Sequence, residues 1–373
     1  MADKKISELT ELTSASPITD VLPIVDTSSN ETKKISLADL PISDAASAQS
    51  LPHTTDFQLG TVQTRNLTTI DNSSGYLNNT NLTAIYIGSN VTSIGDSTFY
   101  GCTNLTSVTI PDGVTSIGSS AFQYATSLTS ITIPNSVSSI GSYAFNYCNF
   151  TSITIPDSVT SIPSHGFSYC SSLTSITIPD SVTSIGSSAF YSCSSLTSIT
   201  IPDSVTSIGA FAFRSCTGIT SIDLPDALTS ISGDSFQSCT NLASINISSV
   251  NASFSSIGGV LFNKNGSTLI TFPNQASSAY TIPNGVTLIG DKAFERCTNL
   301  TSITMGNGVT SIGDRAFSIC SSLTSATISD SVTSIGDYAF QRCTGLTSIN
   351  VPDGVTSIGR SAFRNCPGLT SIN

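Results

Sequence analysis

Residues able to do chemistry are few in this sequence, and most recur at fixed intervals. One cysteine lies three residues after a phenylalanine in each of ten segments, and Ala125 takes that position in one more. The cysteines are Cys102, Cys148, Cys170, Cys193, Cys216, Cys239, Cys297, Cys320, Cys343 and Cys366. This pattern favours buried free thiols that act as small apolar side chains. Disulfides or a metal site are the alternatives, although the Cys-x-x-Cys and Cys/His spacings of zinc sites are absent.

The two histidines, His53 and His165, do not form a catalytic pattern. Neither has a nucleophile at a defined spacing, and no glycine-rich phosphate loop follows a predicted strand. We therefore expect no enzymatic activity and no cofactor. Aspartates follow a proline in four consecutive copies and at two equivalent places, which is favourable turn chemistry. They are Asp157, Asp180, Asp203 and Asp226, with Asp112 and Asp353. A column of such carboxylates could alternatively bind Ca²⁺.

Two further sets of side chains suggest binding. Six of the ten tyrosines lie just before or after a repeated phenylalanine: Tyr100, Tyr124, Tyr143, Tyr147, Tyr169 and Tyr191. Because tyrosine contributes disproportionately to interfaces, we expect a protein contact there. Outward-facing threonines recur in predicted strands: Thr109, Thr132, Thr154, Thr177 and Thr200. This hydroxyl array could be a solvated β-compatible face, could contact a glycan or protein receptor, or could bind ice.

The elements that position these residues form a repeat of 23 residues. Its phenylalanines are Phe99, Phe122, Phe145, Phe167, Phe190, Phe213, Phe236, Phe294, Phe317, Phe340 and Phe363. In the copy that starts at Leu173, the alternation through Ile178 predicts a short strand, and Val182 to Ile185 a second one. A helical turn over 187–191 would then bury Ala189 and Phe190. Such copies cannot fold singly, so the period predicts a solenoid of about eleven coils.

The frame L-x-x-I-x-I-P-x-x-V-x-x-I-G-x-x-A-F resembles the BspA-like (Treponema-type) leucine-rich repeats. The resemblance covers 81–373 and implies an α/β solenoid of short strands and helical turns, used for binding and without catalytic residues. One 58-residue step, from Phe236 to Phe294, contains Asn265-Gly266 and resembles the family's β-hairpin insertion, expected at about 250–280.

Residues 1–41 differ in composition and predict a small hairpin, with strands at 21–26 and 32–37. They resemble the amino-terminal attachment module of bacteriophage tail fibres, which implies a virion protein, often a trimer. The residues expected to attach to other virion proteins are Ile6, Leu9, Leu22, Ile24, Val25 and Ile35. Residues 42–80 read as a linker and amino-terminal cap.

Composition limits the partners. The net charge of −11 disfavours nucleic acid and anionic membranes as partners. The sequence contains no run of 18 apolar residues, so we expect no membrane-spanning helix. The first residues lack the apolar core of a secretory signal, so we expect synthesis in a host cytoplasm. The leading hypothesis is a phage virion protein whose solenoid recognises a host protein or glycan. The alternative is a BspA-like adhesin on a bacterial or protist cell surface.

Overall fold

The structure, a computed structural model, describes residues 21–26, 31–36, 61–64, 68–71 and 74–372. The chain divides into two compact units, 1–62 and 63–373. In the first unit, strands β1 (Val21–Asp26) and β2 (Glu31–Ser36) pair antiparallel, with Leu22 opposite Ile35. This hairpin agrees with the strands expected at 21–26 and 32–37.

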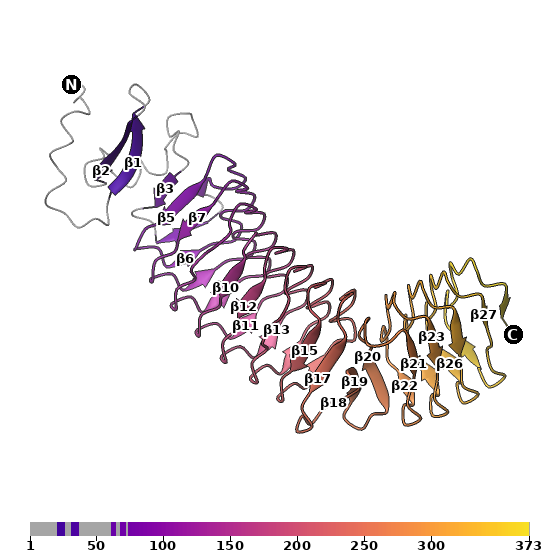
Figure 1. Cartoon of the computed structure of the whole chain (residues 1–373). Helices are drawn as coiled ribbons and strands as arrows, with labels where there is room; N and C mark the ends of the chain where they lie inside the picture. Colours follow the sequence, from indigo (N-terminus) through magenta and orange to yellow (C-terminus); the bar gives the residue numbers. More distant parts are fainter. Residues whose placement is uncertain (1–20, 27–30, 37–60, 65–67, 72–73, 373) are drawn as a thin grey trace, which may run out of the picture. The chain divides into compact units, whose positions relative to one another are not determined.

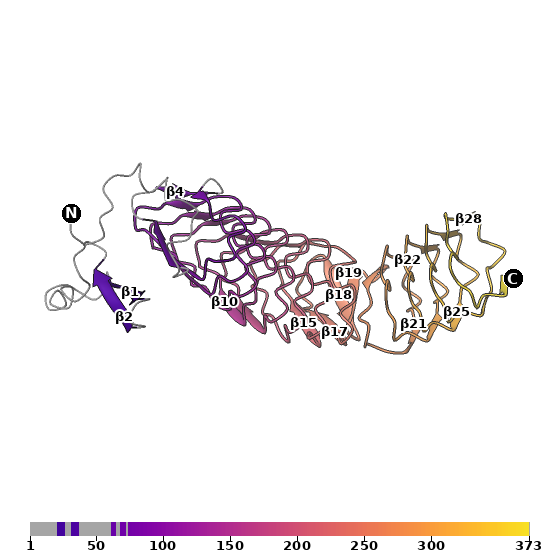
Figure 2. The same cartoon turned by 90° about the horizontal axis from the view of Figure 1, so that it is seen from above.

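The second unit is a stack of coils that follow one another in sequence order, from purple to yellow in Figure 1. Most coils contribute two short strands that pair parallel with those of neighbouring coils, and the two columns of strands run along different sides of the stack (Figure 2). Equivalent residues lie in register, as Ile185 and Ile208 do. Because a slip of one residue would turn the isoleucines outward, the apolar pattern fixes this register. The predicted solenoid is confirmed.

The first column contains the strands of the leucine frame. They are β5 (Ala84–Ile87), β7 (Ser107–Thr109), β10 (Ser152–Thr154), β12 (Ser175–Thr177), β15 (Ser221–Leu224), β17 (Ser244–Ile247), β21 (Ala279–Thr281), β23 (Ser302–Thr304), β25 (Ser325–Thr327), β27 (Ser348–Ile349) and β29 (Ser371–Ile372). Strand β3 (Thr61–Thr64) lies beside β5 at the start of this column.

The second column contains two-residue strands, most of which directly precede a glycine. They are β4 (Thr69–Ile70), β6 (Ser93–Ile94), β8 (Ser116–Ile117), β9 (Ser139–Ile140), β11 (Ser161–Ile162), β13 (Ser184–Ile185), β14 (Ser207–Ile208), β16 (Ser230–Ile231), β22 (Leu288–Ile289), β24 (Ser311–Ile312), β26 (Ser334–Ile335) and β28 (Ser357–Ile358). Strand β4 pairs with β6, so a coil precedes residue 81, where the repeats were expected to begin.

The expected helical turn after each glycine is wrong, because no helix occurs in the described residues. The amides of Ser188, Phe190 and Ser192 donate to carbonyls of the next coil at 2.8 Å, whereas those of Ala189 and Tyr191 close tight turns within their own coil. Ser188 and Ser192 have φ of 55° and 59°, the left-handed region that a right-handed helix excludes. The fold is therefore a β-solenoid, and we call this side of it the turn edge.

The core is a line of phenylalanine rings. Phe190 is fully buried and stacks on Phe167 and Phe213 at centroid distances of 5.8 and 5.4 Å. Tyr76 continues the line before Phe99, at 5.4 Å. All ten cysteines are free thiols, as favoured by the sequence, and all but the half-buried Cys366 are buried.

Each thiol is held by the coil before it. The Sγ of Cys193, for instance, donates to the carbonyl oxygen of Phe167 at 3.1 Å. Burial raises the thiol pKa, to about 12 for Cys170. The column is therefore packing and carries no reactive thiolate.

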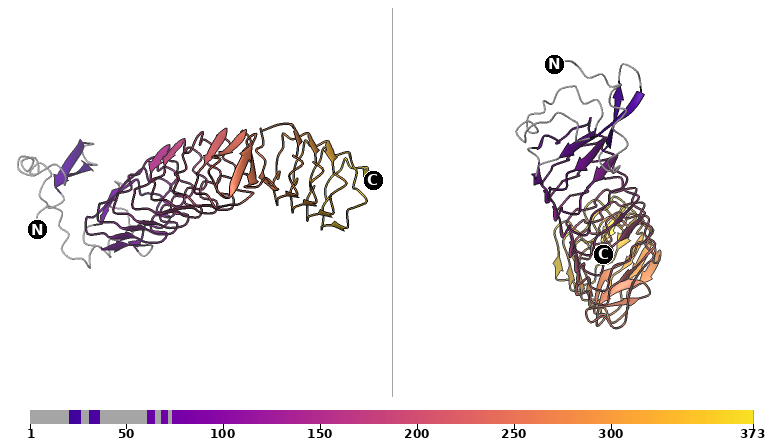
Figure 3. Two further views of the ribbon diagram at one scale, coloured as in Figure 1. Left: turned by 90° about the horizontal axis from the view of Figure 1, so that it is seen from below. Right: turned by 90° about the vertical axis from the view of Figure 1, so that its left-hand side faces the viewer.

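The insertion is a three-stranded antiparallel meander of β18 (Phe254–Ile257), β19 (Val260–Asn263) and β20 (Thr268–Thr271). It lies between the magenta and yellow runs of coils (Figure 3). Asn265-Gly266 reverses the chain as expected. A second reversal, at Gly258-Gly259, was not anticipated; both residues have positive φ, 59° and 79°, as a two-residue hairpin turn requires.

Candidate binding surface

A ladder of tyrosines follows the turn edge of the amino-terminal coils. Tyr124, Tyr147 and Tyr169 sit two residues after the core phenylalanines of their coils, at left-handed positions with φ of 64°, 61° and 60°. Tyr100 and Tyr191 sit one residue after theirs. All five residues are half-buried or exposed, unlike the core phenylalanines beside them. We call these five residues the tyrosine ladder.

The rings of the tyrosine ladder contact one another continuously. Tyr147 stacks on Tyr124 and Tyr169 at centroid distances of 4.8 and 4.3 Å, and Tyr100 and Tyr191 pack edge-on at either end, at 5.4 and 5.0 Å. Because the ring faces contact neighbouring rings, the edges and hydroxyls are what a partner can reach. Such contacts between rings contribute about 0.5–1.5 kcal/mol each and hold the ladder rigid.

The hydroxyl groups in the ladder also interact. Partial desolvation, followed by the neighbouring Tyr191 and Tyr147 hydroxyls, raises the pKa of Tyr169 above its usual range. The Tyr169 hydroxyl is therefore neutral at physiological pH.

A cation extends the ladder toward the next coils. The guanidinium carbon of Arg214 lies 5.4 Å from the centroid of Tyr191 and 5.2 Å from that of Phe211, distances typical of cation–π contacts. The sequence pattern of tyrosines alone did not point to Arg214. Arg214 could have been found from the sequence, because it lies 23 residues after Tyr191 and therefore in the same column of the turn edge.

The sixth tyrosine belongs to a neighbouring column of the same edge. Tyr143 is 38% exposed and stacks on His165 at 4.3 Å, with the ring planes 8° apart. Burial lowers the pKa of His165, so the imidazole is uncharged near neutral pH. His165 therefore pairs with Tyr143 as a neutral aromatic ring.

The five predicted threonines form a separate exposed column on the first-strand side. Thr109, Thr154 and Thr177 lie on β7, β10 and β12, whereas Thr132 and Thr200 lie on equivalent segments without strand hydrogen bonding. The side chains of Thr109, Thr154 and Thr200 are exposed.

Other threonines are already bonded. The hydroxyls of Thr106, Thr174 and Thr183 donate to carbonyls of the preceding coil, at 2.9 to 3.3 Å. Such threonines bridge neighbouring coils, which distinguishes them from the predicted column.

The predicted attachment residues are only partly described. Leu22, Ile24 and Val25 lie on β1, and Ile35 lies on β2. Ile6 and Leu9 lie outside the described residues. Within the described part of the chain, no three His, Cys, Asp or Glu side chains come together as metal ligands, and no helix is long and apolar enough to cross a membrane.

Parallel two-strand coils around a line of inward leucine, isoleucine and phenylalanine side chains define a solenoid of the leucine-rich-repeat class. Residues 68–171, 138–268 and 270–373 match the family model described as a BspA type leucine rich repeat region. The chain therefore belongs to the BspA-type leucine-rich repeat family. The match begins at residue 68, and nothing in the comparisons supports the predicted phage module at 1–41.

Solved structures agree. A leucine-rich cell surface protein from Faecalibacterium prausnitzii A2-165 is 35% identical, with a TM-score of 0.61, over 82% of this chain and 76% of the other. A leucine-rich repeat protein from Bacteroides ovatus ATCC 8483 is 30% identical, with a TM-score of 0.53, over 81% and 82%. The pneumococcal vaccine antigen PcpA is 20% identical, with a TM-score of 0.51, over 78% and 61%, and shares the fold. No curated protein matches the chain.

Proposed function

We propose that this chain is a non-enzymatic, adhesin-type surface protein that binds a partner protein through the tyrosine ladder. The observation that carries the proposal is a continuous ladder of partly exposed tyrosines with Arg214 at its end. Tyrosine and arginine are among the residues most enriched in interface hot spots. The relative from Faecalibacterium prausnitzii, described as a cell surface protein, supports the location.

The partner should be a protein rather than a glycan, because sugars stack on open ring faces and the faces of Tyr147 contact other rings. A rigid ladder also loses little side-chain entropy on binding. Binding over several neighbouring coils would add many weak contacts, which is how repeat arrays use an extended surface.

The test compares two double variants of the full chain on arrays of extracellular proteins and of glycans. Tyr147→Asn/Tyr169→Asn removes two ladder rings, and asparagine tolerates the left-handed backbone. Thr154→Ala/Thr177→Ala is the matched control on the first-strand side. We expect the native chain to bind a protein on the array. The tyrosine variant should bind it at least tenfold more weakly, and the threonine variant should bind it as the native chain does. Glycan binding lost through the threonine variant alone would refute the ladder and favour the hydroxyl column.

The virion hypothesis depends on residues 1–41 and stays a prediction, as do attachment to other virion proteins and trimer formation. Surface labelling of intact producing cells distinguishes the two locations. Labelling of the chain on cells supports the adhesin proposal. Its presence in purified phage particles instead would overturn that proposal.

A further inference from the structure

The columns that run along the solenoid are interrupted between β16 and β22. The phenylalanine line runs without a break to Phe236 and starts again at Phe272, which stacks on Phe294 at 4.8 Å. Within the described residues no ring contact joins Phe236 to Phe272. Each ring elsewhere in the line has a neighbour in the adjoining coil, so this is a gap in the aromatic core.

The backbone ladders stop at the same place. The second-column sheet β11-β13-β14-β16 ends there, as the sheet β4-β6-β8-β9 ends before β11, and the next sheet begins with the insertion, at β18. On the turn edge, Phe213 and Ser215 donate to carbonyls of the following coil at 2.8 and 2.9 Å. The equivalent amides of Phe236 and Ser238 make no such bond to any described residue, and the ladder resumes at Phe272.

The apolar core is divided too. The buried cluster of the carboxy-terminal coils extends from Val260 to Ala362 and contains no residue before Val260. Two backbone hydrogen bonds cross the gap, from the amide of Ile245 to Gly259 and from that of Gln275 to Leu242, both at 2.8 Å. The side chains of Ser256 and Lys264 also donate across it, to the carbonyls of Ile245 and Ser249 at 2.6 and 2.8 Å.

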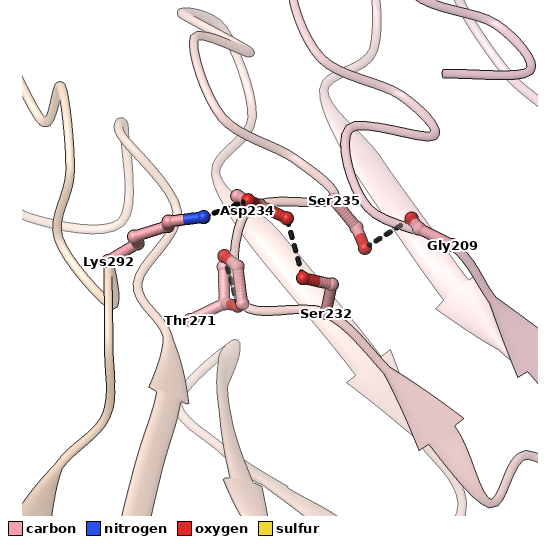
Figure 4. A network of polar contacts seen from close by, with 7 residues as sticks. Gly209, Ser232, Asp234, Ser235, Thr271 and Lys292 are labelled. Atoms are coloured by element: carbon pink, nitrogen blue, oxygen red, sulfur yellow. Dashed lines mark hydrogen bonds and ion pairs between the residues drawn. The ribbon is translucent and has the colours of Figure 1, made fainter. Parts of the chain in front are cut away.

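Polar groups fill the space instead (Figure 4). The Lys292 ammonium lies 2.6 Å from the carboxylate of Asp234, whose side chain is 1% exposed. The Ser232 hydroxyl donates to the other oxygen of Asp234 at 2.6 Å, and the Thr271 hydroxyl donates to the Gly233 carbonyl at 3.1 Å. We call this set the polar layer.

Gly233, Thr271 and Lys292 of the polar layer line a small cavity. Its volume is about 20 Å³, and Gln237 and Arg296 are among its lining residues. The Oε1 of Gln237 and the Nε of Arg296 are both buried without a hydrogen-bond partner in the described structure. One unmet acceptor and one unmet donor on a cavity of this size suit a single water molecule, which can bond to both.

Such a layer couples coils weakly. In a repeat array, cooperativity depends on the interface between neighbours. The attraction within a buried ion pair does little more than offset the free energy of removing its charges from water. Each contact between phenylalanine rings, in contrast, stabilises the interface between two coils. We propose that the hydrated polar layer divides the solenoid into two blocks, 68–250 and 254–372, that unfold independently of each other.

Hydrogen exchange of the full chain, measured by mass spectrometry, tests the proposal. The same substitution, isoleucine to valine, is made at equivalent sites in the two blocks. Ile117→Val lies in the first block and Ile335→Val in the second; both isoleucines are buried in second-column strands. Each variant should speed exchange about two- to tenfold in peptides of its own block. Peptides of the other block should be unchanged. Acceleration of both blocks by either variant would overturn the division.

The polar layer has its own test. A crystal structure at high resolution should show a water bonded to Gln237 and Arg296; an empty cavity would refute the hydrated layer. Lys292→Met, which leaves Asp234 without its ion-pair partner, should speed exchange most in the peptides that contain Asp234 and Lys292.

Discussion

Replacing Phe190 by alanine tests the claim that the ring line stabilises the solenoid. Phe190 is fully buried, and both of its ring faces contact phenylalanines of adjoining coils, at 5.8 and 5.4 Å. Truncating such a side chain leaves a cavity and costs about 3–5 kcal/mol. Coils cannot collapse to fill it, because hydrogen bonds along the second strand column and the turn edge hold their spacing. We therefore expect a loss at the upper end of this range.

Phe363 gives the matched control. It is only partly buried and has one described ring neighbour, Phe340, at 5.5 Å. Phe363→Ala should cost less, about 2 kcal/mol, because less area leaves water on folding. Urea unfolding followed by far-ultraviolet circular dichroism, with one transition fitted for each block, measures both free energies. Equal costs at the two positions would refute the reasoning that stacking on both faces matters.

Three further outcomes are expected. Ser192→Gly should stabilise the chain by about 0.5 kcal/mol in urea unfolding, because glycine relieves the strain of φ 59° but adds unfolded-state entropy; destabilisation would contradict this. Burial raises the pKa of Glu295, so this carboxyl contributes its full stability at acid pH and loses it as pH rises through the folded-state pKa. The melting temperature of Glu295→Gln should therefore rise relative to that of the native chain between about pH 4 and 7. A melting-temperature difference that does not change with pH would exclude this effect. A thiol reagent should label Cys366 in the native chain and all ten cysteines in urea; rapid native labelling of Cys193 would contradict its burial.

The amino-acid sequence determined the repeat and most of the core. A fixed interval places equivalent residues in one column, so the spacing alone assigns Phe190 and Cys193 to the interior. Asn265-Gly266 marked a reversal, and the alternation in 173–178 marked a strand. These inferences succeed because their causes are local or strictly periodic.

Tertiary structure alone decided what happens between coils. The segment 187–191 was expected to be helical, but the amides of Ser188 and Phe190 have acceptors in the next coil, and those acceptors cannot be read from local spacing. His165 and Arg214 join the tyrosines because neighbouring coils bring their columns together. The gap after Phe236 likewise depends on how the insertion packs. Hydrogen bonds and ring contacts between segments distant in sequence are long-range, and a local pattern does not specify them.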